Sequence, residues 1–133
     1  MTNFLVALIL ASPFSSASVP RQYKVATKLY LNGTLFSSPT LVVNEGKLAS
    51  VSDTDLDGTG RFVDVLAERG PKDNQVHLSL AFGKIVAGKR TEIVRPEFLA
   101  LEGEETSMEV SDSDQAGRPV SQVRASVVAT REN

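Results

Sequence analysis

The chain of 133 residues contains no cysteine, no tryptophan and only one histidine. Without cysteine there is no disulfide, no thiolate nucleophile, no cysteine-ligated zinc site and no lipidated N-terminal cysteine. A two-histidine metal site is also excluded, and no G-x-S-x-G motif supplies a nucleophile that could work with His77. We therefore expect the protein not to be an enzyme, and a hydrolase ranks third among the functions considered.

Positive charge is scarce as well. The formal net charge is −2, whereas nucleic acids and anionic membrane surfaces select proteins with a clear excess of lysine and arginine. A short basic strip (Lys84, Lys89, Arg90, Arg95) has no aromatic residues interleaved with it, and no glycine motif suited to a phosphate is present. These absences argue against nucleic acid as a partner and against a nucleotide cofactor.

The longest apolar run lies at the start of the chain. Residues 4–10 read FLVALIL, and Ser15-Ser16-Ala17 follows with small residues at positions −3 and −1. This pattern predicts a signal peptide over residues 1–17 and a mature domain over 18–133 that is periplasmic or secreted, although the first three residues lack a basic side chain. A membrane anchor would need about 20 apolar residues. The other alternative is a buried first strand or helix of a cytoplasmic protein.

One stretch of the sequence occurs twice. Residues 39–63 align without gaps with residues 96–120 at an offset of 57, with nine identities in 25 positions. A fixed offset of this length indicates a duplicated supersecondary unit. We expect one domain with copies at about residues 24–82 and 83–133. The identical pairs are Pro39/Pro96, Glu45/Glu102, Gly46/Gly103, Ser50/Ser107, Asp55/Asp112, Asp57/Asp114, Gly60/Gly117, Arg61/Arg118 and Val63/Val120.

Short alternating segments separated by turn residues make up most of the mature chain. Residues 25–31, 75–82 and 120–130 alternate apolar and polar positions, as half-buried strands do, and Asn32-Gly33 is a strong hairpin signal. At the offset of 57 the inward face of the last strand is out of register, so we expect a one-residue bulge or an insertion near Pro119. The predicted fold is all-β, an antiparallel sandwich or partly closed barrel of two tandem strand-turn-strand repeats. The alternative is a sheet with one short helix at residues 63–68.

The most specific local motif is a row of aspartates that begins at Asp53. Its D-x-D-x-D-G spacing matches a calcium-binding loop, with Asp64 where the bidentate glutamate would stand. The alternative is a solvated hairpin connection, since no helices flank the loop. The candidate metal ligands are Asp53, Asp55, Asp57 and Asp64, and calcium is the one cofactor considered.

Glu45 and Glu102 recur in both copies, which makes hydrolysis by paired carboxylates an alternative. Each precedes a turn glycine, where an acidic residue is ordinary turn chemistry. Shared catalysis is therefore the less favoured interpretation.

The repeated unit begins Pro39-Thr40-Leu41, continues through Gly46 and Ala49-Ser50-Val51, and ends in the strand at residues 62–66. It resembles the β-hairpin unit of bacterial secretin-type outer-membrane proteins, and a similar periplasmic module that follows some membrane-embedded peptidases of the antirepressor type. The resemblance covers about 25 residues per copy and implies a periplasmic β-module in a Gram-negative bacterium. No functional residues carry over from it.

Taken together, the patterns predict an exported, non-catalytic β-domain that binds another protein of the cell envelope and does not insert into the membrane after cleavage. The alternative is a calcium-dependent module, or one that binds a carbohydrate or other small ligand.

Overall fold

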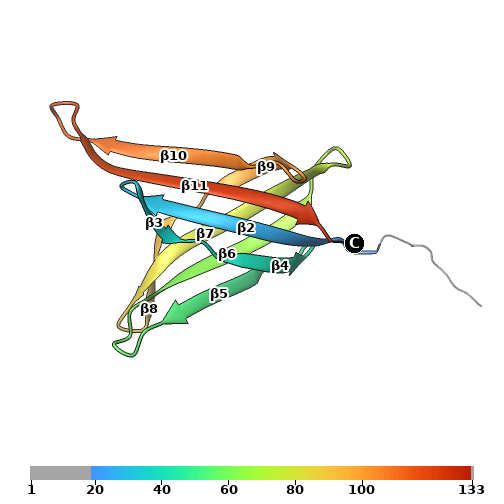
Figure 1. Ribbon diagram of the computed structural model, residues 1–133, viewed down its shortest axis with the longest axis horizontal. Coiled ribbons are helices and arrows are strands. Elements are labelled where there is room, and N and C mark those ends of the chain that lie inside the picture. Colours follow the sequence, from blue (N-terminus) through green and yellow to red (C-terminus); the bar gives the residue numbers. More distant parts are fainter. Residues whose placement is uncertain (1–18, 133) are drawn as a thin grey trace, which may run out of the picture.

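The computed structural model describes residues 19–132, which form ten β-strands and no helix. Two antiparallel sheets of five strands pack as a sandwich (Figure 1). This confirms the all-β prediction, with a sandwich-like arrangement and no closed barrel among the described residues. The alternative of a short helix at residues 63–68 is wrong, because these residues lie within a strand. In chain order the strands are β2 (Gln22–Leu31), β3 (Thr34–Ser37), β4 (Thr40–Asn44), β5 (Ala49–Thr54), β6 (Gly60–Arg69), β7 (Gln75–Val86), β8 (Lys89–Val94), β9 (Glu97–Leu101), β10 (Thr106–Ser113) and β11 (Pro119–Arg131).

Each sheet contains strands from both halves of the chain. Sheet 1 has the order β10-β11-β2, and both β3 and β4 pair with the far side of β2. Sheet 2 has the order β5-β6-β7, and both β8 and β9 pair with the far side of β7. The pairing pattern therefore repeats between β2–β6 and β7–β11, with the break between Arg69 and Gln75. The boundary expected from the sequence, residues 82/83, falls inside β7.

The core follows from the alternation of side chains along the strands. Val25 and Leu29 of β2 are fully buried between the two sheets, as are Leu78 and Phe82 of β7. Each apolar side chain of this size contributes about 1.5–3 kcal/mol when it is buried. Valine, leucine and alanine fill most of the core, as the scarcity of aromatic residues predicts.

Two equivalent turns carry the chain from one sheet to the other. Gly46, between β4 and β5, has a φ of 78°, and Gly103, between β9 and β10, has a φ of 83°. The Gly46 N–H donates to the Ala67 carbonyl at 2.9 Å, and the Gly103 N–H donates to the Ala129 carbonyl at 2.8 Å. Because this left-handed conformation favours glycine, the turn explains why glycine recurs at both positions.

The gapless alignment fails in the hairpins that follow. Gly58 N–H donates to the Asp55 carbonyl, and Gly117 N–H donates to the Asp114 carbonyl, so Gly58 rather than Gly60 is the counterpart of Gly117. Beyond the turn, Ala49 pairs with Val65 and Thr106 pairs with Val127, an offset of 62 between the partner residues. The β10–β11 hairpin is therefore longer by 62 − 57 = 5 residues.

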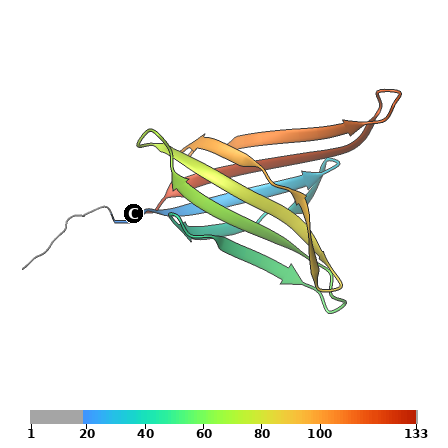
Figure 2. The same cartoon turned by 180° about the vertical axis from the view of Figure 1, so that it is seen from behind.

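Part of this extra length is a β-bulge. The β10–β11 register shifts between Asp112, which pairs with Ser121, and Ser113, which pairs with Pro119. Val120 is left without a partner, so the bulge predicted near Pro119 is confirmed. Seen from both sides, the β10–β11 hairpin extends beyond the neighbouring β2–β3 turn (Figures 1 and 2).

Candidate functional site

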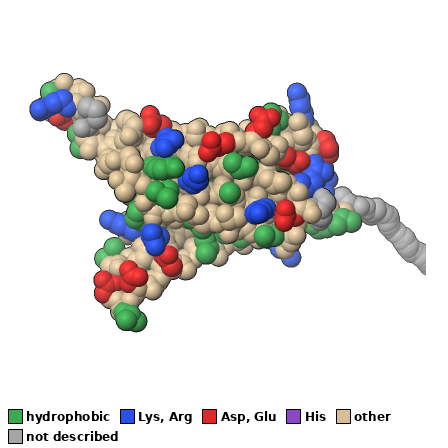
Figure 3. All heavy atoms as spheres, viewed as in Figure 1, with side chains coloured by type: hydrophobic (Ala, Val, Ile, Leu, Met, Phe, Trp, Pro, Cys, Tyr) green, Lys and Arg blue, Asp and Glu red, His purple; other side chains and the backbone are tan. Residues whose placement is uncertain are grey.

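A pocket of about 290 Å³ lies where the β3–β4 connection of sheet 1 faces the β5–β6 hairpin of sheet 2. The hairpin ends of the two sheets project as separate arms with a recess between them (Figure 3). The pocket is lined by Ser37, Ser38, Pro39, Val51, Ser52, Asp53, Arg61, Phe62 and Val63. It is the candidate binding site.

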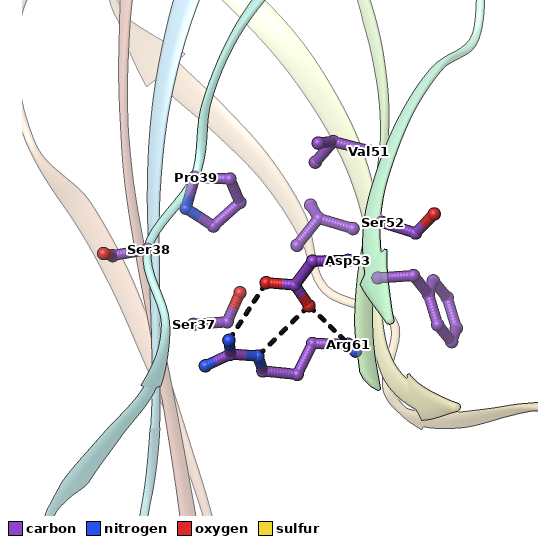
Figure 4. Close-up of a pocket in the computed structure, with 9 residues that line it drawn as sticks. Ser37, Ser38, Pro39, Val51, Ser52, Asp53 and Arg61 are labelled. Carbon is purple, nitrogen blue, oxygen red and sulfur yellow. Dashed lines mark hydrogen bonds and ion pairs between the residues drawn. The ribbon is translucent and has the colours of Figure 1, made fainter. Parts of the chain in front are cut away.

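An ion pair dominates the polar part of the pocket. The Arg61 guanidinium donates through Nη2 to Asp53 Oδ2 at 3.0 Å and through Nε to Asp53 Oδ1 at 3.4 Å. Its Nη1 donates across the gap to the Phe36 carbonyl at 2.9 Å. In Figure 4, Ser37 points toward this pair, whereas Ser38 points away from it. The guanidinium is thus held in one orientation by both sheets.

The polar side chains of the pocket suit a polar ligand. The Ser37 hydroxyl makes no hydrogen bond to another residue within 19–132, so no base among these residues activates it. The Arg61 and Asp53 side chains are 48% and 64% exposed, so solvent screens their charges.

The sequence did not point to Ser37 or Arg61 as site residues. The only available signal was the position of Asp53 and Arg61 on either side of a hairpin.

The equivalent position of the β10–β11 hairpin holds no ion pair. Asp53 pairs with Arg61 across β5–β6, and the equivalent position of β10–β11 holds Val110 opposite Val123. At this position the β5–β6 hairpin therefore carries an ion pair, whereas the β10–β11 hairpin carries two valines.

The four predicted calcium ligands are not brought together. Asp53 faces the pocket, whereas Asp64 lies on the opposite face of the sheet, because alternate residues of a strand point to opposite faces. The Asp57 carboxylate accepts from the side chain and the backbone N–H of Thr59, which lowers its pKa. Asp55 lies in the same turn. Within the described residues, no group of three or more acidic or histidine side chains could hold a metal ion.

Asp64 belongs instead to a cluster on the outer face of sheet 2. Its carboxylate accepts from Arg90 Nη2 at 2.9 Å and from the Ser50 hydroxyl at 2.6 Å. Burial raises the pKa of Asp64, but the hydrogen bonds from Arg90 and Ser50 outweigh this effect and the pKa lies below its usual value. The Arg90 guanidinium also lies 3.8 Å from the centre of the Phe62 ring. The cluster explains why Phe62 is buried on an outward face.

The repeated glutamates lie at the opposite end of the sandwich, close to the first and last strands' outer ends at Arg21 and Glu132 (Figure 1). Glu45 accepts from Arg69 Nε at 2.6 Å, and Glu102 accepts from Arg131 Nε at 3.0 Å. Arg69 and Arg131 end the equivalent strands β6 and β11. Each glutamate therefore ties a turn to the end of a strand, and this geometry favours a structural role over shared catalysis.

The single histidine is remote from the pocket. His77 Nε2 lies 3.2 Å from Glu97 Oε1, and the two residues are on the neighbouring strands β7 and β9. This is the cross-strand position expected from the sequence.

Comparison of the chain with protein-family models, curated proteins and solved structures finds no match. The resemblance to the secretin hairpin therefore stays an expectation. Residues 19–132 contain no helix that is long and apolar enough to cross a membrane. The predicted signal peptide lies outside the described residues.

Proposed function

We propose that this chain is an exported, non-catalytic β-sandwich that binds another protein of the cell envelope through an unpaired sheet edge. The observation that carries the proposal is the state of β5 and β10, the equivalent outermost strands of the two sheets. Among the described residues each pairs on one side only, β5 with β6 and β10 with β11. Five of six residues of β5 and six of eight residues of β10 are exposed.

An unpaired edge offers a row of free backbone N–H and C=O groups to an extended segment of another protein. Main-chain hydrogen bonds then supply affinity, and the side chains beside the edge supply specificity. This mode of binding needs no reactive side chain, which fits the composition of the chain.

Site-specific photo-crosslinking in the cells that produce the protein tests the proposal. A photoreactive residue at Ser52 of β5 or Ser111 of β10 should give an adduct with an envelope protein. The same residue at Lys24 is the matched control and should give none, because Lys24 is exposed on β2 and that strand is paired on both sides there, with β11 and with β4. Adducts from Lys24 alone, or from none of the three positions, would contradict the proposal.

The pocket beside Asp53 and Arg61 supports a second candidate function, the binding of a carbohydrate or other small polar ligand. Calorimetric titration with calcium tests whether this second function depends on a bound calcium ion. Heat from the full chain that is lost in Asp55→Ala would support it, and the absence of heat would end it.

A further inference from the structure

We propose that β10 is the docking edge and that its partner is an extended, basic protein segment in which lysine or arginine alternates with apolar residues. This inference rests on the proposed function, because it assumes that a sheet edge is the binding site. It specifies which of the two equivalent edges binds and what chemistry the edge selects.

The first observation is charge. The loop before β10 and β10 itself carry four exposed acidic side chains that form no ion pair among residues 19–132, and Arg124 of β11 lies opposite one of them, Glu109. They are Glu104, Glu105, Glu109 and Asp112. The nearest other acids are neutralised, since Glu102 pairs with Arg131 and Asp114 pairs with Arg118. A basic segment lying along β10 would supply the missing positive charge, which favours its association over that of acidic segments.

The equivalent edge does not share this character. The only acid of β5 is Asp53, and Arg61 already pairs with it. Charge therefore distinguishes β10 from β5, although the two strands hold the same place in the fold.

The second observation is the apolar inner side of the same strand. Met108 and Val110 lie where β5 has Val51 and Asp53, and Val110 is 45% exposed. Val120, in the bulge opposite the end of β10, is 64% exposed. Asp112 lies on the same face as Met108 and Val110, because the register is unbroken as far as Asp112 and alternate residues of a strand share a face. A strand added to β10 would therefore place every second side chain beside Met108, Val110 and Asp112, and the others beside Glu109. Apolar residues match Met108 and Val110, and basic residues match Glu109 on one face and Asp112 at the end of the other.

The same charges argue against a second copy of this chain as the occupant. β10 carries Glu109 and Asp112 and no basic residue, so two β10 strands side by side would repel each other. Acidic side chains on an edge discourage self-association while leaving the edge open to a partner of opposite charge.

The test is a titration of the full chain with synthetic nine-residue peptides, in which the NMR chemical shifts of the protein's backbone amides report binding. The probe alternates lysine and valine, and its control alternates glutamate and valine. We expect the lysine peptide to bind at least about tenfold tighter at low salt, because several weak charge pairs add. Its affinity should fall as salt is raised. The protein amides whose chemical shifts change most on binding should lie in β10. Equal affinity for both peptides, or no binding of the lysine peptide, would overturn the inference.

A charge-reversed variant makes the test independent of folding defects. In the double variant Glu109→Lys/Asp112→Lys, the preference should switch to the glutamate peptide, and an unfolded protein would not gain this affinity. The double variant Glu68→Lys/Glu132→Lys changes the net charge equally at exposed sites outside β10 and should keep the original preference. Retained preference for the lysine peptide in the β10 variant would overturn the inference.

The outcome also separates this inference from the proposed function. If crosslinking captures a partner from Ser52 of β5 while the lysine peptide fails to shift β10, the inference is wrong and edge binding stands. If neither edge captures a partner, the proposed function fails.

Discussion

At the scale of single residues, Glu45 shows how a repeated acidic residue can serve structure. Burial raises its pKa, but hydrogen bonds from Arg69 and from the Arg21 backbone N–H outweigh this effect and the pKa lies below its usual value. Because the folded pKa is below the unfolded one, the carboxylate contributes stability above about pH 4.3, the unfolded value. The contribution is lost as the pH falls through the folded pKa.

This sign leads to a prediction for Glu45→Gln. The substitution should lower the free energy of unfolding at pH 7 by about 1–2 kcal/mol, because a charge-assisted hydrogen bond is lost. The difference from the unmodified protein should shrink as the pH falls through the lowered pKa of the folded state, because below it the carboxyl group is protonated in both states. Urea unfolding at several pH values measures it. Glu104→Gln, at an exposed site without an ion pair, is the control, and an equal loss in the control would contradict the account.

Gly83 shows that a glycine in a strand can be required by packing. A Cβ atom at this position would overlap the Phe62 ring and the Thr91 carbonyl oxygen. Gly83→Ala should therefore lower the free energy of unfolding by about 2–3 kcal/mol. Ser79→Ala on the same strand should change it by less than about 0.5 kcal/mol. Thermal or urea unfolding compares the two variants, and similar values would contradict the packing shown here.

At the scale of elements, the two β-hairpins that begin the halves use different turn residues. Asn32 has a φ of 51° and Ala87 a φ of 53°, and each precedes a glycine. Alanine in this left-handed region costs about 1 kcal/mol, whereas asparagine tolerates it. Ala87→Asn should therefore stabilise the protein by about 0.5–1 kcal/mol. Ala116→Asn, in a turn without positive φ at that residue, should be neutral in the same unfolding assay. No gain at Ala87 would contradict the turn geometry.

Alternation made most strands predictable, since buried positions such as Val25 and Leu29 recur with a period of two. The register of the last hairpin was harder to predict. The β5–β6 turn and the β10–β11 turn both contain aspartate and glycine. The gapless alignment therefore matches Gly60 with Gly117, whereas the hydrogen bonds show that Gly58 is the structural counterpart of Gly117. β7 was expected to end near Phe82, and it continues to Val86, because residues 83–85 pair with both β6 and β8.

At the scale of the whole molecule, the two halves interlock. β2 of the first half pairs with β11 of the second along nine residues, from Tyr23 opposite Arg131 to Leu31 opposite Val123. β6 and β7 join the halves in the other sheet in the same way. Neither half contains a complete sheet.

The interlocked topology predicts that the halves fold only together. Fragments 19–72 and 73–133 should each lack cooperative unfolding when alone, because each would expose the sheet faces that the other covers. Mixed in equal amounts, they should regain the circular dichroism spectrum of the intact chain and a cooperative thermal transition. Cooperative unfolding of either fragment alone would contradict the pairing.

The sequence could not predict the candidate sites, because they depend on which strands lie at the edges. Asp53 and Arg61 became a pocket pair only through the β5–β6 register and the proximity of the β3–β4 connection. Likewise, the acids near Glu109 became an edge feature only once β10 proved to pair on one side. The aspartate spacing suggested calcium because spacing alone does not show that Asp53 and Asp64 point to opposite faces.

Hydrogen exchange of the backbone amides of β10 tests most directly whether this strand is an open edge available to a partner. In an antiparallel edge strand, alternate N–H groups point to the neighbouring strand or to solvent. The account predicts that slow and fast amides alternate along β10 in the free protein, whereas the amides of β11 that lie between β10 and β2, from Val123 to Val127, are all slow. Uniformly slow exchange along β10 would show that the edge is already covered and would contradict the account.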